Sequence, residues 1–498
     1  MDTNIPVGSK VYVNSRTIPN KDKAILLVIL FIPCILISQT VNNDLWFILN
    51  NGRYVLNNGI PHFDPFSLHQ NLAYVMQQWL SSVIFWAIYS KLGLAGLSML
   101  IIAAYVAITW FVFSICMLIS ENNLFTAFAV TLFSSIFTSL YMVQRPFIFF
   151  LLIVTIELYL LESYIRRKNA GYLVPLPLLS ALMVNLQAAM WPVLFIILLP
   201  YIVDSFNFKI LFLKGEGFPK KAFYLAIAGM IAAGLLNPYG IDAMTYLFRS
   251  IGYNAINQHV NEMLPPDINN PIGMMIFLVI GLVISAYLLY RKSDTKLRYV
   301  LLTIGIMIMT LSSIRSFSLF CICGIVPLAY YFRNVSIKEG RFVEKGSRAV
   351  LLMRRILIVF VCVLIFLCLY MKYRDAQRQT QEYLLPAAID YLQKNTDTKK
   401  IILYTGFDDG SYVEFRGLKP YIDVRAEVFV KKNNKKEDII EEYVSLQAGI
   451  TYYRKILDKY KFTHLLVSKS DILESYLPYD NEYKLVYSNK DYSIYEKL

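Results

Sequence analysis

Long apolar segments separated by short polar ones fill most of the first three quarters of this chain. A membrane-spanning helix needs about 20 apolar residues, with a range of about 17 to 25. Segments near this length predict about eleven spans, at 24–41, 95–119, 124–143, 147–164, 172–187, 189–206, 222–237, 271–290, 299–314, 317–332 and 350–371. The pattern therefore predicts an α-helical polytopic membrane protein.

Basic residues are concentrated in alternate loops between these predicted spans. The clusters are Arg166-Arg167-Lys168, Lys209 to Lys221, Arg291 to Arg298 and Arg333 to Arg355. Because Lys and Arg are enriched in cytoplasmic loops, a threading with all four clusters on one side places the N-terminus in the cytoplasm. Most of the formal net charge of +13 lies in these loops, so it sets orientation and does not indicate binding to nucleic acid.

Residues 76–92 are also apolar enough to span a membrane. Counting them as a span would place Arg166-Arg167-Lys168 on the outer side and break the charge pattern. An amphipathic helix in the outer interface keeps the pattern, with its polar side chains facing water. We therefore predict an interfacial helix here, as part of a first outer loop over residues 42–94.

The two ends of the chain differ from the predicted transmembrane domain, residues 24–371. Residues 1–23 are polar and basic and lead into an apolar run without a cleavage site, which predicts a cytoplasmic segment and a retained first span. An odd number of spans places residues 372–498 outside. Their pattern predicts a small extracytoplasmic α/β domain, with strands at 400–404, 412–415, 420–424 and 464–468, a helix over 437–460 and a terminal hairpin of 484–487 with 493–496.

Composition agrees with a membrane protein, because 56% of the 498 residues are hydrophobic and the mean hydropathy is +0.48. The six cysteines lie in apolar runs and show neither a disulfide framework nor zinc spacing. The sequence has no P-loop, zinc-protease motif or nucleophile elbow. These patterns disfavour an enzyme that uses a cytosolic nucleotide.

The first outer loop holds several polar side chains just outside an apolar span, which is costly and favours a site. Asp44 lies next to the span end, where a sheltered carboxylate can accept a proton from a hydroxyl group. It can also cap a helix or pair with Arg53. Asp64 precedes a proline, so it either starts a turn or serves as a second acid or as a group that positions the acceptor. His62 lies nearby and is a candidate for positioning a substrate.

Further polar residues reach the same predicted outer face. Arg145 and Arg315 lie at span boundaries and either snorkel to the interface or bind a phosphate, which the planar guanidinium suits. The stretch Asn237-Pro238-Tyr239-Gly240 is most simply a turn. In the outer domain, Asp423 with Arg425 forms either a functional edge or an internal ion pair. The candidates for positioning a substrate or acceptor are Glu262, Asn185, Asn237, Tyr239, Asp423 and Arg425.

The order of these elements resembles the GT-C superfamily of membrane glycosyltransferases, which includes protein O-mannosyltransferases, oligosaccharyltransferases and aminoarabinose transferases. In that family a first span precedes an outer loop with an acidic catalytic residue, whose place Asp44 takes here. A closer resemblance is to an uncharacterised group of bacterial membrane proteins with GT-C-like architecture. The motifs that carry it are Asp44-Leu45-Trp46, Gly52-Arg53, Asp64-Pro65-Phe66-Ser67, Trp79-Leu80, Arg145-Pro146, Asn185-Leu186-Gln187, Asn237-Pro238-Tyr239-Gly240 and Asp423-Val424-Arg425. The chain departs from that group at Gln77-Gln78, where His-Glu is common, and at Gln187, where His is common.

The resemblance implies a multi-pass transferase of the bacterial cytoplasmic membrane. Its donor would be a polyprenyl-phosphate-linked sugar, and its acceptor a glycan, a lipid or a protein of the cell envelope. Asp44 would act as the base of an inverting transfer. The departing phosphate would be stabilised by arginines, namely Arg145, Arg315 and Arg53, or by a divalent cation such as Mg or Mn. The alternatives are a lipid-linked sugar transporter or flippase and a non-enzymatic envelope assembly protein. Few ionisable groups lie in the middles of the predicted spans, which disfavours transport.

Overall fold

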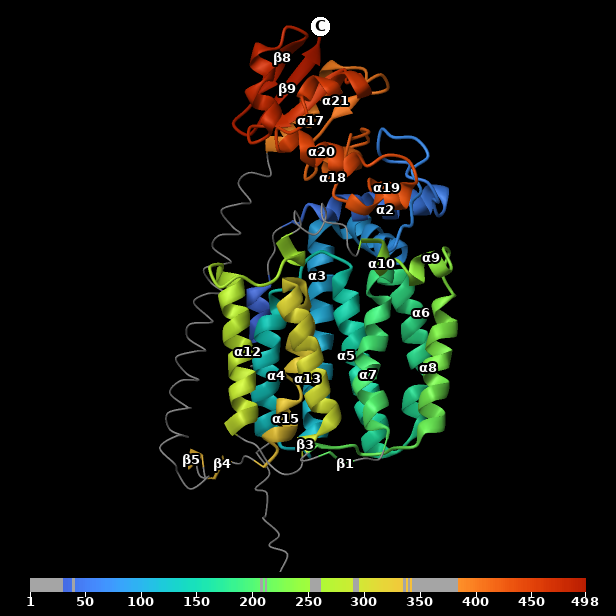
Figure 1. The fold of residues 1–498 in the computed structure, drawn as a ribbon, viewed down its shortest axis with the longest axis vertical. Coiled ribbons are helices and arrows are strands. Elements are labelled where there is room, and N and C mark those ends of the chain that lie inside the picture. Colours follow the sequence, from blue (N-terminus) through green and yellow to red (C-terminus); the bar gives the residue numbers. More distant parts are fainter. Residues whose placement is uncertain are drawn as a thin grey trace, which may run out of the picture.

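The computed structural model describes residues 30–37, 41–206, 209–210, 213–250, 261–289, 295–334, 337–338, 341–342 and 384–498. Long helices run side by side through most of these residues and form a bundle (Figure 1). The C-terminal residues gather at one end of the bundle, which we call the upper end, together with helix α2 (Asp44–Asn58). The short strands β1 (Lys209–Ile210), β2 (Leu213–Lys214) and β3 (Thr295–Lys296) belong to the opposite, lower end.

The buried faces of the bundle helices share one apolar core. The helices are α3 (Trp79–Ile119), α4 (Leu124–Ser139), α5 (Phe147–Arg167), α6 (Leu176–Gln187), α7 (Trp191–Asp204), α8 (Lys220–Gly234), α12 (Pro271–Leu289), α13 (Leu297–Ser312), α14 (Phe317–Leu319) and α15 (Leu328–Tyr331). A π-helical turn over Phe320–Gly324 joins the last two. Local chemistry sets the helix ends. The Asn123 side chain accepts a hydrogen bond from the Thr126 N–H at the start of α4, and Lys168 ends α5 in a left-handed conformation.

Five stretches of the described helices are long and apolar enough to cross a membrane. They are Trp79–Ile119, Phe147–Arg167, Ala170–Asp204, Pro271–Leu288 and Ile314–Tyr331, and α4 and α13 are shorter apolar helices. Helices α3 to α15 occupy the predicted spans between 95 and 332. The predicted span 350–371 and half of 24–41 lie outside the described residues, and the described part of 24–41 contains a short 3-10 helix over Ile32–Leu36. The count of eleven spans and the domain boundaries stay predictions.

The described basic loops meet at the lower end, as the charge threading expects. Strand β2 pairs with β1 and with β3, so two of the basic loops form one small sheet. Strands β4 (Ile337–Lys338) and β5 (Arg341–Phe342) form a separate pair at the same end (Figure 1). Which side of a membrane this end faces stays a prediction from the charge pattern.

The segment after α2 is bent. Gly93 adopts φ 61° and ψ −154°, which lies outside the helical region and divides α3 into residues 79–92 and 94–119. The predicted interfacial helix and the span that follows it are therefore two separate helices. Helix α2 packs closely on the first of them, because a Cβ atom at Gly52 would lie 2.0 Å from the carbonyl oxygen of Ser82. This close approach explains the glycine of the Gly52-Arg53 motif.

Residues 384–498 form a four-stranded sheet with helices around it. The strand order is β6 (Leu403–Tyr404), β7 (His464–Ser468), β9 (Tyr492–Lys497) and β8 (Tyr483–Ser488). The first pair is parallel and the other two are antiparallel. The helices are α17 (Leu384–Asn395), α18 (Gly410–Phe415), α19 (Lys431–Asn434), α20 (Ile439–Gln447) and α21 (Tyr453–Tyr460). The predicted strand at 464–468 and the terminal hairpin are confirmed.

Three expectations for this region are wrong. Residues 412–415 lie in helix α18, residues 420–424 are irregular, and the helix expected over 437–460 is two helices separated at Gly449. The aromatic residues of α18 have high strand propensity, but tertiary packing overrides it. Tyr412 and Phe415 both pack on the Trp46 ring of α2, with centroid distances of 4.9 and 5.0 Å.

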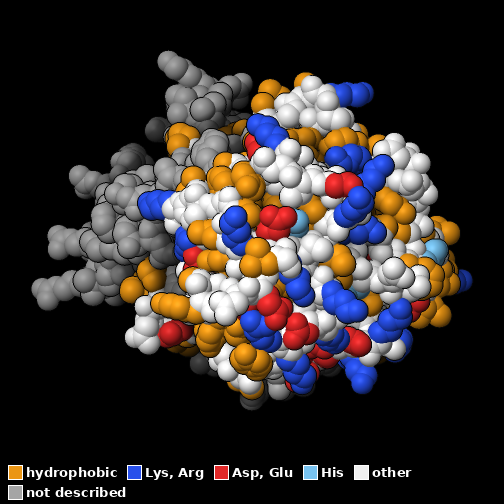
Figure 2. Space-filling view, turned by 90° about the horizontal axis from the view of Figure 1, so that it is seen from above, with side chains coloured by type: hydrophobic (Ala, Val, Ile, Leu, Met, Phe, Trp, Pro, Cys, Tyr) orange, Lys and Arg blue, Asp and Glu red, His pale blue; other side chains and the backbone are white. Residues whose placement is uncertain are grey.

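The first outer loop and the C-terminal residues form a single layer above the bundle. Phe66, Leu72 and Met76 of the loop belong to the same apolar cluster as the core of the C-terminal sheet. The backbone is shared as well, because the Leu68 N–H donates to the Pro420 carbonyl at 3.0 Å. Figure 2 shows acidic and basic side chains interspersed over the upper face of the molecule. The polar loop therefore does not stand alone on the bundle but forms a layer with residues more than 300 positions later in the chain.

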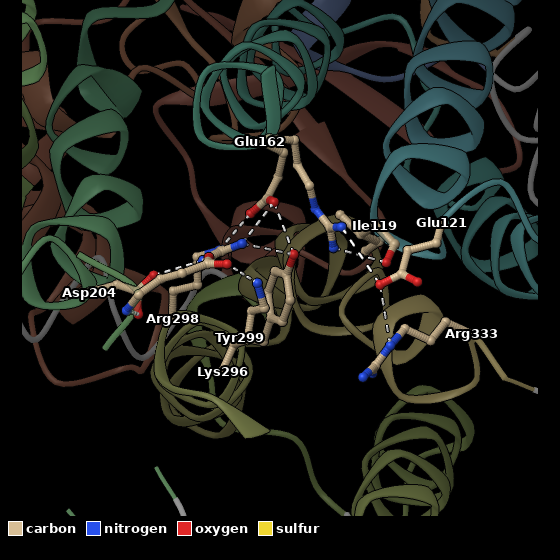
Figure 3. A network of polar contacts seen from close by, with 10 residues as sticks. Ile119, Glu121, Glu162, Asp204, Lys296, Arg298, Tyr299 and Arg333 are labelled. Carbon is tan, nitrogen blue, oxygen red and sulfur yellow. Dashed lines mark hydrogen bonds and ion pairs between the residues drawn. The ribbon is translucent and has the colours of Figure 1, made fainter. Parts of the chain in front are cut away.

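A buried ionic network joins the helices near the lower end (Figure 3). Arg298 of α13 contacts Glu162 of α5 (Nε to Oε1, 3.0 Å), Asp204 of α7 (Nη1 to Oδ2, 2.7 Å) and Glu216. The Tyr299 hydroxyl donates to Glu162 at 2.9 Å. The side chains of Arg298, Glu162 and Asp204 are at most 2% exposed. Losing one partner would leave an uncompensated buried charge, so the network fixes the relative positions of three helices.

Candidate active site at the upper end of the bundle

Asp44 begins α2 at the upper end of the bundle. The Asp44 backbone N–H donates to the Asn42 side chain at 3.0 Å, so a local polar contact fixes the turn that starts the helix. A carboxylate in the first turn is also favoured by the helix dipole. This local structure holds the Asp44 carboxylate at the helix start. The carboxylate itself pairs with a residue from another part of the chain.

That partner is Arg145, in the segment between α4 and α5. All three of its guanidinium nitrogens have a partner: Nε is 2.8 Å from Asp44 Oδ2, Nη1 donates to Glu262 Oε1 at 2.7 Å, and Nη2 donates to Asn42 Oδ1 at 3.0 Å. The following residue, Pro146, caps α5, so a helix start holds the arginine in place. One guanidinium therefore joins two carboxylates and a side-chain amide from distant parts of the chain.

Arg315 lies next to this group. Its segment is pinned to that of Glu262, because the Ser313 hydroxyl donates to the Glu262 carbonyl at 2.9 Å and the Ile314 N–H donates to the Leu264 carbonyl at 3.0 Å. The Arg315 guanidinium lies over the Phe147 ring, 5.0 Å from its centroid. Among the residues that the structure describes, this guanidinium has no hydrogen-bond acceptor. We call Asn42, Asp44, Arg145, Glu262 and Arg315 the Arg145 cluster.

The two carboxylates of the Arg145 cluster differ in their affinity for protons. Burial raises the pKa of Asp44 above its ordinary value, and the nearby arginines reduce this effect without reversing it. Burial also acts to raise the pKa of Glu262, but Arg145 and Arg315 outweigh it and the pKa is lowered. Relative to their ordinary behaviour, the surroundings therefore favour protonation of Asp44 and ionisation of Glu262. A carboxylate whose pKa is moved toward neutrality is the better general base.

Asp408 reaches the same place from the C-terminal residues. It lies in the turn between β6 and α18, and its side chain is exposed to solvent at the surface of the turn. Partial desolvation and the nearby Asp44 carboxylate raise the pKa of Asp408. The two carboxylates are therefore close enough to repel each other. The sequence analysis did not single out this residue.

Asp64, Asp423 and Arg425 lie together, but in a different group. The Arg425 guanidinium pairs with Asp64 (Nη1 to Oδ1, 2.7 Å), with Glu414 (Nη2 to Oε2, 3.0 Å) and with Asp423. All four side chains are at most 2% exposed. Asp423 and Arg425 therefore form an internal ion pair, which was one of the two alternatives for them. Arg425 also pairs with Asp64 of the first loop. We call these four residues the Arg425 clamp, because they join the first loop to the C-terminal residues.

Arg53 also joins these two parts of the chain. Its Nη2 donates to Asn50 Oδ1 at 2.6 Å and to the Phe415 carbonyl at 2.8 Å. The guanidinium lies over the Trp86 and Phe415 rings, 5.6 and 5.1 Å from their centroids. Nine residues of helix separate it from Asp44, about 13 Å at 1.5 Å per residue. The structure therefore does not bring Arg53 into the Arg145 cluster.

His62, Tyr239 and Asn237 form a further contact at the upper end. The His62 and Tyr239 rings meet edge to face with centroids 5.3 Å apart, and the Tyr239 hydroxyl donates to the Pro61 carbonyl at 2.8 Å. The Asn237 side chain accepts from the Tyr239 N–H and donates to the Gly234 carbonyl, which makes it a turn residue. The structure places these residues where two loops meet and does not bring them into the Arg145 cluster.

Asn185 likewise has structural partners. Its side-chain oxygen accepts a hydrogen bond from the Trp79 indole at 2.9 Å, and its amide donates to the Leu236 carbonyl at 2.8 Å. The residue therefore joins the start of α3 to the chain just after α8. Trp79 begins α3, so the Trp-Leu motif and the Asn-Leu-Gln motif meet through this bond.

The architecture resembles that of solved oligosaccharyltransferase structures from Archaeoglobus fulgidus. One is tethered to an acceptor peptide that contains the NVT sequon; it gives a TM-score of 0.59 at 12% identity over 96% of this chain and 74% of that chain. The apo form gives 0.56 at 11% identity, over 90% and 69%. A complex with Zn and sulfate gives 0.52 at 12% identity, over 90% and 67%. The chain has an oligosaccharyltransferase fold.

The likeness to the oligosaccharyltransferase is one of fold, because the sequence identity is low. No protein-family model matches the chain, and no curated protein matches its sequence. This fold agrees with the helical membrane bundle that the sequence resemblance led us to expect. It does not select a subfamily.

Two residues of the site in this oligosaccharyltransferase fold were missed in the sequence. Asn42 contacts both Asp44 and Arg145, and its only sequence signal is its place just before the acidic residue. Asp408 belongs to Asp408-Asp409-Gly410, whose signal is a pair of acids in a turn. Acidic residues are common in turns of a polar domain, so this pair alone does not predict a site. Asp408 becomes a candidate only because the packing of the chain brings it near Asp44.

The neighbour of Asp408 gives a pH-dependent prediction. Burial raises the pKa of Asp409 to about 7, and the Asp408 and Asp471 carboxylates add to the effect, although the Tyr492 hydroxyl donates to Asp409 at 2.8 Å. The ordinary value is about 4. A raised pKa means that folding favours the protonated acid, so this group contributes stability at low pH that is lost as pH rises toward 7. Asp409→Asn should therefore raise the Tm relative to wild type more at pH 8 than at pH 5, measured on the purified protein in detergent. An equal change at both pH values would contradict this origin.

Proposed function

We propose that the protein is a membrane glycosyltransferase of the GT-C class. It transfers a sugar from a polyprenyl-phosphate-linked donor to an acceptor in the cell envelope, at the upper end of the bundle. The observation that carries the proposal is the Arg145 cluster, in which an acid with a raised pKa stands beside two arginines at one end of a bundle with the oligosaccharyltransferase fold. The protein is placed in the bacterial cytoplasmic membrane with the upper end outward, in agreement with the basic loops at the lower end.

The reaction needs one proton transfer and one substitution at carbon. Asp44 removes the proton of an acceptor hydroxyl, whose oxygen attacks the anomeric carbon of the donor. The bond between that carbon and the phosphate oxygen breaks, and polyprenyl phosphate leaves with the bonding electron pair. Attack opposite the leaving group inverts the configuration. Arg145 orients the Asp44 carboxylate through its 2.8 Å contact, which lowers the entropic cost of reaching the reactive geometry.

Arg315 is the principal contact for the donor phosphate in this proposal. Its guanidinium has no hydrogen-bond acceptor among the described residues, whereas the three nitrogens of Arg145 are already in contact with protein groups. A fixed positive group in a site shielded from water stabilises the charge that develops on the leaving phosphate. The polyprenyl tail would lie among the bundle helices, whose outward faces are apolar. Asp64 acts indirectly, since it holds the first loop in the Arg425 clamp.

The test of this function compares lipid-linked sugars and envelope glycans, by mass spectrometry, in cells with and without the gene. We expect the deletion to lose one glycan modification and to accumulate its lipid-linked donor, and the wild-type gene to restore both. A flippase would give the same accumulation but with the donor confined to the inner leaflet. An assembly protein would leave the donor pool unchanged. Either of these two results would overturn the transferase proposal.

The proposal for Arg315 predicts weaker use of the donor after Arg315→Gln. A hydrogen bond to a charged group is worth about 1.5 to 3 kcal/mol, so we expect kcat/KM for the donor to fall about 10- to 100-fold. Arg315→Lys keeps the charge and should lose less. The measurement is the initial rate of transfer against donor concentration in membranes. If Gln and Lys at this position lose equal activity, the charge is not what Arg315 contributes.

A further inference from the structure

The charges of the Arg145 cluster balance without any added ion. Asp44 and Glu262 bring two carboxylates, and Arg145 and Arg315 bring two guanidinium groups. Arg145 lies between the carboxylates, 2.8 Å from Asp44 and 2.7 Å from Glu262. The Arg145 guanidinium thus contacts two carboxylates and the Asn42 amide oxygen. Oxygen ligands of this kind surround a metal cation when one is bound in an acidic site.

The fold raises the question of a metal ion, because one of the similar oligosaccharyltransferase structures is a complex with Zn and sulfate. Protein sites for divalent cations gather several oxygen, nitrogen or sulfur ligands around the ion. Across the part of the chain that the structure describes, no three His, Cys, Asp or Glu residues come together in a group able to hold a metal. One oxygen of each carboxylate, Asp44 Oδ2 and Glu262 Oε1, is already in contact with Arg145.

Electrostatics points in the same direction. A divalent cation between Asp44 and Glu262 would stand where the Arg145 guanidinium now is, or directly beside it. Two like charges about 4 Å apart repel strongly when water is partly excluded. The charge of Arg315 also acts on both carboxylates, as their pKa values show. The described residues of the Arg145 cluster therefore do not fit a divalent metal ion.

We propose that the Arg145 guanidinium takes the place of a divalent cation in this site, and that transfer by this protein requires no divalent metal. The guanidinium holds Asp44 and Glu262 in fixed positions and supplies positive charge between them. Arginine cannot lose its proton at physiological pH, so the charge is permanent. The Asn42 side chain, which accepts from Arg145 Nη2 at 3.0 Å, fixes the plane of the guanidinium.

The test measures metal binding directly, with Mn²⁺ as the probe, by electron paramagnetic resonance on the purified full-length protein in lipid nanodiscs. Wild type and Arg145→Lys should show no stoichiometric Mn²⁺ site. Arg145→Ala removes the central cation and leaves two carboxylates facing each other. It should bind Mn²⁺ at least about tenfold more tightly than wild type, since a like-charge contact has been removed. Adding Asp44→Asn to Arg145→Ala should abolish the gained binding.

Two results would overturn the proposal. The first is a wild-type protein that binds one Mn²⁺ as tightly as Arg145→Ala and loses it on Asp44→Asn. The second is a folded Arg145→Ala protein that gains no binding. If Arg145→Ala does not fold, the comparison of wild type with Asp44→Asn still decides the first point. Binding is measured without any transfer assay, so failure of the proposed transferase function would leave this result interpretable. Where transfer is measured, it should persist after treatment with a chelator.

Discussion

Asp44→Asn should lower the rate of sugar transfer by about 100- to 10,000-fold, the range that general-base catalysis usually contributes. The substitution keeps the shape of the side chain and its place beside Arg145, but an amide cannot accept the proton of an acceptor hydroxyl. Burial raises the pKa of Asp44, which makes this carboxylate a stronger base than an ordinary aspartate. The measurement is the glycan product and the lipid-linked donor, quantified by mass spectrometry in deletion cells that carry the variant.

Asp267→Asn is the matched control for this experiment. Asp267 lies in the segment that leads from Glu262 to α12, is exposed, and contacts Asn269 within its own turn. An asparagine there can still accept the same hydrogen bonds, so we expect transfer at the wild-type level. Both variants must reach the membrane in equal amounts and melt at similar temperatures. Near-wild-type transfer by such an Asp44→Asn protein would remove Asp44 from the role of base.

The helical bundle follows from local sequence features. A long apolar run has to form a helix in a membrane, because lipid offers no partners for backbone polar groups. Apolar character alone did not decide between a span and an interfacial helix at 76–92. We used the positions of the basic residues to choose the interfacial helix. The break in α3 at Gly93 separates this segment from the helix that follows, and its place at the interface stays a prediction. These are properties of single segments, which is why they could be predicted without knowing the packing.

The composition of the site could be predicted only in part. Asp44, Arg145, Glu262 and Arg315 were each candidates, but the sequence gives no sign that these four meet while Arg53 and His62 do not. Arg145 and Glu262 are 117 residues apart. Their contact depends on how helices pack, and local pattern carries no information about that. The acid Asp408 was missed for the same reason.

Asp64 shows how a local pattern can suggest two chemistries that only packing separates. An aspartate before a proline in an outer loop suits either a turn or a second acid. Its actual partner, Arg425, is 361 residues away, and the ion pair is buried. The Phe66 and Tyr74 rings cover the guanidinium, with centroids 5.0 and 5.2 Å from it. A carboxylate enclosed in this way holds two parts of the chain together and is shielded from an acceptor.

The largest loss of stability should follow from Arg425→Met. The substitution leaves Asp64, Glu414 and Asp423 buried without their shared cation, and breaking one side of a buried ionic group usually costs about 3 to 5 kcal/mol. We expect a clearly lower Tm for the purified protein in detergent. Because the clamp joins the first loop to the C-terminal residues, amide hydrogen exchange should rise in both of them, around residues 62–76 and 412–425, and much less in the bundle.

The contrast with an exposed ion pair separates this effect from a general loss of charge. Lys400 pairs with Asp397 in the same C-terminal region, and both of these side chains are more than half exposed. Surface pairs contribute little because water screens them, so Lys400→Met should leave Tm and exchange nearly unchanged. Adding Asp64→Asn to Arg425→Met should recover part of the lost stability, since it removes one of the uncompensated carboxylates. If Arg425→Met is no more harmful than Lys400→Met, the clamp does not hold the upper layer in place, and the position of the first loop above the bundle must depend on its other contacts.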